Sequence, residues 1–537
     1  MRKTLSLLFF LFLVCGHMPV SGQGETDSPS GNPVVFTSSN LPIVIINTHG
    51  MTIQDDPKIK VDIGIIDNGP GVRNNMNDPL TFSGFCGIEV RGSSSQSFPK
   101  KSYGFEMWNA YMQTIDTSLL GMPSESDWIL NANYSDKTFC RNTLAYQTWM
   151  NMDHYATRYR HVELVINGDY QGIYIFSEKI KRDKNRVDIS KLKSSDVAGD
   201  DVTGGYIIKI DKTTGSGGAG WTSDFLPLAH PSGQTIYFQY EYPSSNDIVY
   251  QQQLYIQRYV DTFETVLAGP NFSDTLIGFR KYASENKFID YFIVNEISKN
   301  VDGYRLSTYF YKDRKSKGGK LKMGPVWDYD IAWHNADYCG GDLYTDWAYQ
   351  FPCSYDWYQV PFWWDRLMDD PLFKNRLKCR WSTLRQSFLS KDAINNYVDS
   401  LAYSLDEAQE RNFTKWPILG VYVWPNPYPI PATYAGEIEN LKTWISNRLD
   451  WMDAHMPGTC STTGIGEGEP TESAFAAYPN PVQSILYLEM DLPRAMNVTG
   501  TISTIEGQEI MRFADGMRDA GYITNQVNMQ NLKPGMY

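Results

Sequence analysis

The stretch from Phe288 to Asn335 constrains the fold more than any other part of the sequence. A polar turn at 300–303 separates a helix-length apolar run from two strand-like runs, 306–311 and 321–326, which a basic turn joins. The apolar run has the spacing of one buried helix face, through Phe288, Ile289, Phe292, Ile293 and Ile297. The order helix, acidic turn, hairpin, acidic turn predicts that both acidic turns lie at the same end of a small sheet.

Each of these turns carries an aspartate, Asp302 in the first and Asp328 in the second. Two carboxylates at one sheet end can divide the work of phosphoryl transfer, because one can hold the magnesium that bridges the phosphates while the other orients the attacking hydroxyl. Aspartate is also common in turns, where it bonds to nearby backbone N–H groups. The spacing alone leaves a catalytic and a turn-capping interpretation open.

A serine-rich loop at 92–99 is a second candidate for anion binding. Its short side chains allow backbone N–H groups to approach a phosphate, as in an anion-binding nest. Lys100 and Lys101 follow the loop, and a lysine there either places a compact positive charge beside phosphates or lies exposed at the start of a strand. We prefer Lys101, because it shares a strand face with Tyr103 and Phe105.

Four blocks of the sequence, in the expected order, resemble the CotH family. These spore coat protein H-like proteins form an atypical branch of the protein kinase-like fold. The blocks are RGSSS followed by PKKSY (91–95, 99–103), WILNANYSDKTFCRN (128–142), GDYQGIY running on to Glu178 (168–178), and NVDG, YFY and GPVWDYD (300–303, 309–311, 324–330). The resemblance implies an α+β fold of two lobes, a β-rich N-lobe and a helical C-lobe. It also implies a protein kinase that transfers the γ-phosphate of ATP to serine or threonine of a protein whose identity the sequence does not reveal.

The resemblance assigns roles to the acidic turns. Asp302 would orient the acceptor hydroxyl, and Asp328 would bind the Mg²⁺ or Mn²⁺ ion that bridges the ATP phosphates. Asp330 shares a face with Asp328 if the chain stays extended, and is either a second metal ligand or a bystander. Kinases place a second metal-binding asparagine five positions after the catalytic aspartate, where this chain has Ser307, so binding of a second metal stays open.

The resemblance also indicates nucleotide-binding residues in the first lobe. Lys101 and Ser94 would contact the ATP phosphates, and Glu178 would support either the lysine or the nucleotide, unless it only pairs with a neighbouring lysine. The predicted helix 136–150 carries no glutamate to form the usual Lys–Glu pair of kinases. Arg141 on this helix has either a structural role or a phosphate contact.

The composition changes along the chain in a way that predicts four parts. Residues 1–22 are typical of a secretory signal peptide, and the resemblance to the CotH family implies a kinase-like domain over 36–455. A linker rich in Gly, Ser, Thr and Pro covers 456–474. Short alternating strands then fill 475–537, which resembles a truncated C-terminal sorting domain of the type IX (Por) secretion system, a small β-sandwich. This implies passage through the type IX machinery and a secreted or outer-membrane surface location.

The net charge of −13 argues against nucleic acid as a partner. Aromatic residues make up 14% of the chain and are dense after Asn335, where they either fill a core or form a stacking surface for glycans or peptides. Because ATP is scarce outside cells, a rival interpretation is a non-catalytic surface or matrix protein that binds glycan or protein. Six cysteines follow the signal peptide, and Cys339 and Cys353, which flank a loop-like segment, are the predicted disulfide.

Overall fold

A computed structural model describes residues 31–213, 218–228, 230–460, 475–478, 484–492, 496–503, 509–519 and 521–530. The chain divides into two compact units, Met1–Thr459 and Cys460–Tyr537. The predicted signal peptide, 1–22, lies outside the described residues, as does most of the predicted linker. No helix in the described ranges has both the length and the apolar content needed to cross a bilayer.

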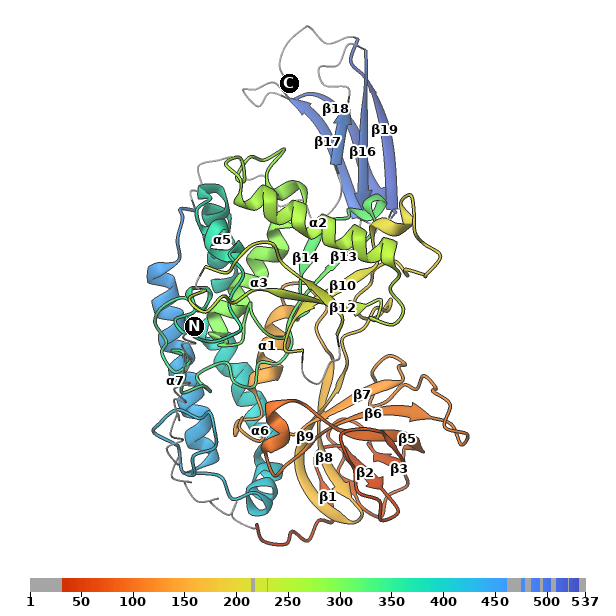
Figure 1. Cartoon of the computed structure of the whole chain (residues 1–537), viewed down its shortest axis with the longest axis vertical. Helices are drawn as coiled ribbons and strands as arrows, with labels where there is room; N and C mark the ends of the chain where they lie inside the picture. Colours follow the sequence, from red (N-terminus) through yellow and green to blue (C-terminus); the bar gives the residue numbers. More distant parts are fainter. Residues whose placement is uncertain are drawn as a thin grey trace, which may run out of the picture. The chain divides into compact units, whose positions relative to one another are not determined.

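The first unit begins with a closed β-barrel in the strand order β2-β3-β5-β6-β7-β9-β8 (Figure 1). The strands are β2 (Ile43–Asn47), β3 (Ile59–Ile66), β5 (Phe82–Arg91), β6 (Ser102–Trp108), β7 (Asp127–Asn131), β8 (Tyr159–Ile166) and β9 (Asp169–Glu178). Parallel pairing of β2 with β8 closes the barrel, and the other pairs are antiparallel. Beside it, β1 (Ser38–Ser39) pairs with β4 (Asn74–Asn75). Alternate apolar side chains of the barrel strands form one core cluster, so the β-rich structure predicted for the first part of the domain is present.

A second, antiparallel sheet follows in the order β11-β12-β10-β13-β14. Its strands are β10 (Tyr206–Ile210), β11 (Gly220–Thr222), β12 (Tyr237–Tyr242), β13 (Thr308–Lys312) and β14 (Leu321–Met323). Ile208 and Phe310 lie on the face that joins the main core, whereas Lys209 and Tyr309 project from the opposite face. The predicted hairpin of the central stretch is therefore part of a larger sheet.

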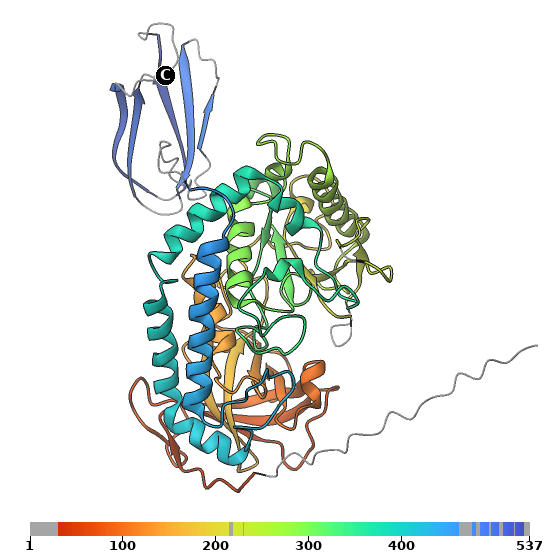
Figure 2. The same cartoon turned by 90° about the vertical axis from the view of Figure 1, so that its left-hand side faces the viewer.

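Seven helices pack around the main core of the described part of the first unit, and most of them follow the second sheet's first strands in the chain. They are α1 (Arg141–Met150), α2 (Tyr250–Ala268), α3 (Glu285–Ser298), α4 (Trp363–Met368), α5 (Pro371–Arg385), α6 (Lys391–Lys415) and α7 (Tyr434–His455). The predicted helix 288–297 is α3, which is buried along most of its length and packs on α1, α5 and α7. Figure 2 shows α6 and α7 running side by side, and α6 also contacts β9 of the barrel.

The aromatic residues after Asn335 divide between the two predicted roles. Trp363 and Trp364 are each 1% exposed and lie in the main core. Trp357 is 59% exposed, and Tyr344 is also open to solvent. The core interpretation is therefore confirmed for Trp363 and Trp364, whereas a stacking surface that includes Trp357 stays a prediction.

The second unit contains β15 (Phe475–Tyr478), β16 (Ile485–Leu492), β17 (Met496–Ser503), β18 (Glu509–Arg518) and β19 (Gly521–Asn528). They form two sheets, β15-β16-β19 and β17-β18. Leu488 and Val527 from the first sheet share a small core with Ile502 from the second. The short alternating strands expected in this region are present.

The predicted disulfide between Cys339 and Cys353 is confirmed, with 5.4 Å between the Cα atoms. Cys379 and Cys460 are also disulfide-bonded. Cys86 and Cys140 are buried free thiols.

Candidate active site

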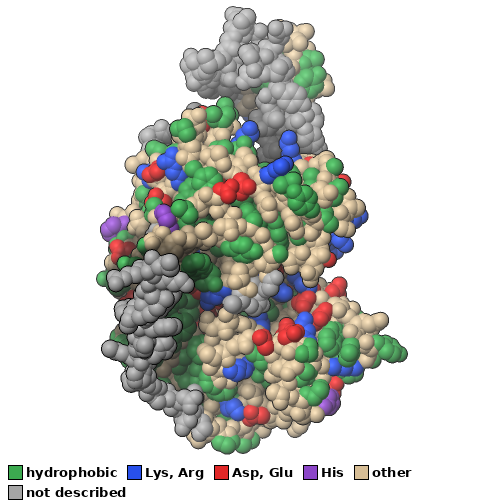
Figure 3. Space-filling model, in the orientation of Figure 1, with side chains coloured by type: hydrophobic (Ala, Val, Ile, Leu, Met, Phe, Trp, Pro, Cys, Tyr) green, Lys and Arg blue, Asp and Glu red, His purple; other side chains and the backbone are tan. Residues whose placement is uncertain are grey.

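A cavity of about 960 Å³ lies between the barrel and the second sheet. Barrel strands β5, β6, β7 and β9 line one side of it, and β10, β13 and the two acidic turns line the other. Charged side chains of both signs gather where the barrel meets the rest of the unit (Figure 3). The cavity is therefore polar on both walls.

The first acidic turn places Asp302 in this cavity. Helix α3 ends at Ser298, and Lys299 adopts a left-handed conformation (φ of 42°) that turns the chain. The Asn300 side chain accepts a hydrogen bond from the Asp302 backbone N–H at 3.1 Å. Asp302 is thus held at a tight turn whose geometry is set by the end of a buried helix.

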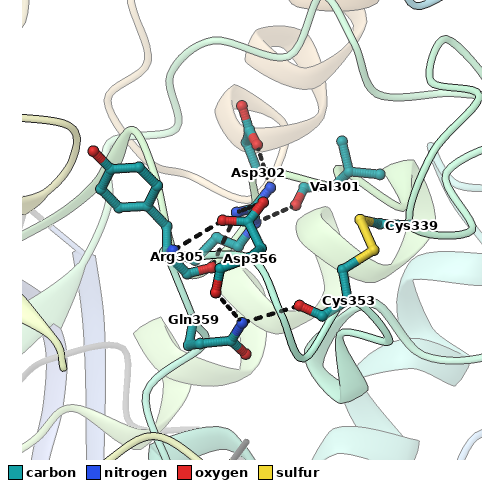
Figure 4. The surroundings of a disulfide bond; sticks show 8 residues. Val301, Asp302, Arg305, Cys339, Cys353, Asp356 and Gln359 are labelled. Atoms are coloured by element: carbon teal, nitrogen blue, oxygen red, sulfur yellow. Dashed lines mark hydrogen bonds and ion pairs between the residues drawn. A yellow bond between two sulfur atoms is a disulfide. The ribbon is translucent and has the colours of Figure 1, made fainter. Parts of the chain in front are cut away.

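A buried arginine fixes the Asp302 carboxylate (Figure 4). Arg305 is 2% exposed, and its guanidinium contacts Asp302 Oδ1 at 2.8 Å and Asp356 Oδ2 at 3.2 Å. Since a guanidinium is planar and rigid, two carboxylates and the arginine hold one another in a defined arrangement.

The second acidic turn places Asp328 and Asp330 in the same cavity. Asp328 has a left-handed backbone (φ of 65°), so the chain is not extended here, and the predicted shared strand face is wrong. Asn142 Oδ1 accepts from the Tyr329 backbone N–H at 2.6 Å, and the Tyr329 hydroxyl donates to Asn295 Oδ1 at 3.0 Å. Side chains of α1 and α3 therefore set the direction of this turn, and both carboxylates reach the cavity despite the bend.

The second turn lacks a counter-charge of the kind that Arg305 provides. Among the described residues, none forms an ion pair within 4 Å of Asp328 or Asp330, although the positive charges of Arg91 and Lys212 act on Asp328 and partly oppose the rise of its pKa. The Asp328 side chain is exposed to the cavity, but protein atoms surround it and exclude much of the bulk water. This desolvation, together with the negative charge of Asp302, raises the pKa of Asp328 to about 6. Burial, with the charge of Asp328, raises the pKa of Asp330 well above its usual range.

Basic side chains lie on other parts of the cavity wall. Lys209 on β10 is 7% exposed and pairs with Glu241 at 2.8 Å. Lys212 Nζ donates to Ser94 Oγ at 3.3 Å, and Arg91 lies over the Trp327 ring. The cavity thus holds separate acidic and basic groups, as a site for a phosphate–metal complex requires.

The family model of the CotH kinase protein matches residues 88–452, which contain the acidic turns and the basic residues just described. The chain belongs to the CotH kinase protein family. A second family model, the secretion system C-terminal sorting domain, matches residues 476–537. No curated protein shows a significant match to the chain.

The structure separates the predicted nucleotide-binding residues of the CotH domain. Ser94 lines the cavity, within the short 3₁₀ helix η1 (Ser94–Ser97). Lys101 is not among the lining residues, and its ammonium donates to the backbone oxygen of Gln96 at 2.6 Å. Lys100 is buried and donates to Asn412 Oδ1 at 3.0 Å, also away from the cavity.

Glu178 and Arg141 both lie outside the cavity lining. Glu178 is fully buried and pairs with Arg158 at 3.0 Å and Arg186 at 3.1 Å, rather than with Lys101. Arg141 pairs with Asp136 at 2.6 Å, which is the structural alternative for this residue. The first lobe thus contains no Lys101–Glu178 pair.

Sequence reasoning missed several lining residues of the CotH domain, among them Arg305, Lys209, Asp211, Glu241 and Asn142. Lys209 and Asp211 lie two positions apart at the end of a strand, so the run GGYIIKIDK placed both on one face and could have indicated them. Glu241 reaches Lys209 only through the pairing of β10 with β12. Asn142 is 1% exposed, and its Nδ2 has no hydrogen-bond partner, a feature that only the structure reveals.

The acidic residues fit a magnesium ion that is shared with a nucleotide. Among the residues described, no group of three or more His, Cys, Asp or Glu side chains could hold a metal by itself. Magnesium often binds through one or two carboxylates together with substrate phosphates and water, so a complete protein cage is not required. The oxygen donors of Asp328 and Asp330, which have no ion pair of their own, match that mode of binding.

Proposed function

We propose that the CotH domain is a metal-dependent protein kinase that transfers the γ-phosphate of ATP to serine or threonine. The observation that carries this proposal is the presence of Asp302 and Asp328 in one cavity, the first paired with Arg305 and the second without an ion pair. A kinase needs one carboxylate to orient the acceptor and one to bind the metal.

In this proposal Asp328, with Asp330, holds Mg²⁺ or Mn²⁺, which neutralises charge on the phosphates. Asp302 accepts a hydrogen bond from the acceptor hydroxyl and then its proton. The acceptor oxygen forms a bond to the γ-phosphorus, the bond from that phosphorus to the bridging oxygen breaks, and ADP leaves. Arg305 keeps the Asp302 carboxylate aimed while the substrate binds.

On the basic wall, Lys209 and Arg91 are the residues that we propose to contact the phosphates directly, together with Ser94. Lys101 would act through the loop that carries Ser94, because it bonds to Gln96. Glu178 would act through the ion pairs that it forms at the end of β9. Lys209→Met should weaken ATP binding about tenfold, because it removes one charge-assisted hydrogen bond to a phosphate. Lys101→Met should weaken ATP binding less, because Lys101 does not line the cavity.

The test is magnesium-dependent ATP binding and autophosphorylation by the mature chain, 23–537, beside Asp302→Ala and Asp328→Ala. Labelling by the parent alone, with loss of metal-dependent binding only in Asp328→Ala, supports the proposal and the two roles. Absence of ATP binding by the parent would overturn it.

A second candidate function is binding of glycan or protein without catalysis. It is favoured by Trp357 and Trp424, which are 59% and 49% exposed and line the same cavity. The Tyr338 ring stacks on Trp424 with 5.9 Å between centroids, a platform that suits a sugar ring. Carbohydrate binding in a chain that binds no ATP would decide for this function.

The match to a sorting domain supports export by the type IX machinery to the cell surface or the medium. Deletion of 476–537 should leave the protein inside the cell envelope, which fractionation would detect.

A further inference from the structure

We propose that Arg305 is a positioning residue for Asp302, and that the Cys339–Cys353 disulfide, acting through Asp356, keeps Arg305 in place. The catalytic part of this inference rests on the proposed kinase function, whereas its structural part does not.

Every nitrogen of the Arg305 guanidinium is engaged. Nη2 contacts Asp302 Oδ1 at 2.8 Å, and Nε donates to the backbone oxygen of Val301 at 2.7 Å. Nη1 contacts Asp356 Oδ2 at 3.2 Å and donates to the backbone oxygen of Tyr358 at 3.0 Å. The guanidinium therefore ties the turn that carries Asp302 to the segment 353–359.

The Phe351 ring restricts Arg305 further. The guanidinium carbon lies 4.1 Å from the ring centroid, within the range of a cation–π contact. With 2% of its surface exposed, Arg305 has no alternative partner in solvent. Displacement of 353–359 would leave the buried Arg305 without one of its two carboxylate partners, which is costly for a buried charge.

The segment 353–359 is held at its start by the disulfide (Figure 4). Gln359 Nε2 donates to the backbone oxygens of Cys353 at 3.0 Å and Asp356 at 2.7 Å, so the segment folds on itself. Cys339 anchors it to the chain that follows the second acidic turn. The disulfide thus restrains the same segment that supplies Asp356 to Arg305.

Charge explains why Asp302 needs such restraint. Asp302 and Asp328 lie close enough in the cavity for their charges to interact unfavourably. Without Arg305, Asp302 would turn away from Asp328 and from the position that orients an acceptor. Misplacement of a catalytic group by about 1 Å can cost about 100-fold in rate.

The structural part is tested by amide hydrogen exchange of the mature chain with Cys339→Ser/Cys353→Ser. We expect exchange to accelerate about tenfold or more at residues 300–306, because they lose their tie to 353–359. The control is Cys379→Ser/Cys460→Ser, which removes other disulfide-bonded cysteines and should leave 300–306 unchanged. Unchanged exchange at 300–306 in the first variant would overturn the role of the disulfide.

The catalytic part is tested with Arg305→Met beside a matched control, Arg366→Met. Arg366 also pairs with a carboxylate three residues away, donates to two backbone oxygens and lies over a phenylalanine ring, but it does not line the cavity. We expect kcat to fall about 100-fold in Arg305→Met with the ATP Kd changed less than about twofold, and no fall in Arg366→Met.

Each result has a distinct meaning. An unchanged kcat in Arg305→Met, or an equal loss in both variants, would overturn the positioning role. A parent that binds no ATP would overturn the proposed kinase function instead, and exchange at 300–306 would still report whether the disulfide holds the turn.

Discussion

The two acidic turns that line the cavity of the CotH domain are stabilised in opposite ways. In the first turn, Arg305 neutralises and orients Asp302 from a fully buried position. In the second turn, hydrogen bonds from α1 and α3 fix the backbone around Tyr329, but Asp328 has no ion pair. The protein thus orients the carboxylate of one turn with its own arginine, while the carboxylate of the other turn has no such partner among the described residues, which is the basis of the proposed metal site.

This difference is the basis on which we propose different roles for the two turns, which their spacing in the sequence left open. A carboxylate that is already paired keeps its orientation whether or not ligand is present, which suits a group that must orient a hydroxyl. A carboxylate whose pKa is raised to about 6 by burial and by a like charge gains most from a bound cation. The contrast can be tested by changing each turn separately.

The largest effect is expected from Asp328→Asn. If the second turn binds the metal, this change should lower the rate of phosphoryl transfer about 1000-fold, because metal binding contributes several kcal/mol of charge stabilisation. Metal-dependent ATP binding, measured by calorimetry with and without Mg²⁺, should be lost as well. ATP affinity that still depends on Mg²⁺ would assign the metal to another group.

A smaller loss is expected from Asp302→Asn in the first turn. The rate should fall about 100-fold or more, the usual contribution of a positioned acid–base group, while Mg²⁺–ATP affinity stays close to that of the parent. Rates of autophosphorylation at saturating ATP would measure this. A parallel loss of affinity would show that the two turns share one role.

The pH dependence should distinguish the turns further. In the proposed function Asp328 would bind metal in its ionised form, so Mg²⁺-dependent ATP affinity should be complete above pH 7 and decline as the pH falls through about 6. At pH 5 about a tenth of the carboxylates are ionised, which predicts an affinity about tenfold lower. Affinity that is constant from pH 5 to 7.5 would contradict the raised pKa.

The smallest effects are expected on stability, with opposite signs for the two turns. The pKa of Asp328 in the folded state exceeds its unfolded value of 3.8, so the free energy of unfolding falls as the pH rises from about 4 to about 6. Above pH 6 the ionised carboxylate continues to destabilise the folded state. Without metal at pH 7.5, Asp328→Asn should raise the free energy of unfolding by about 1 kcal/mol, since cavity water screens part of the cost.

Asp302→Asn should instead lower the free energy of unfolding, because it removes a charge partner of the buried Arg305. Urea denaturation of both variants and the parent at pH 7.5 would compare these signs. At pH 3.5 the gain from Asp328→Asn should disappear, since both states are then largely protonated at this position.

Local patterns predicted the parts of the site that depend on neighbours in sequence. The period of the apolar residues in 288–297 indicated a helix, and the alternating strands after it indicated the hairpin that brings Asp302 and Asp328 to one cavity. The loop-like segment between Cys339 and Cys353 likewise indicated their disulfide. In each case residues close in the chain determine the contact.

Other parts of the site depend on which way a strand faces, which the sequence did not reveal. Lys101 was preferred because it shares a face with Tyr103 and Phe105, but these two side chains belong to the barrel core. Ser102 and Gly104, on the opposite face of the same strand, line the cavity, together with Phe105 but without Lys101. Closure of the barrel decides which face is the inner one, and closure depends on pairing between strands far apart in sequence.

The closed barrel has a further consequence for a protein that carries an export signal. A strand at the edge of an open sheet presents unpaired N–H and C=O groups that invite pairing with another chain. In this barrel β2 and β8, the strands that would otherwise form such edges, pair with each other along Ile43–Ile46 and Glu163–Ile166. The closed barrel of the first unit therefore offers no free sheet edge among its seven strands for pairing with another chain.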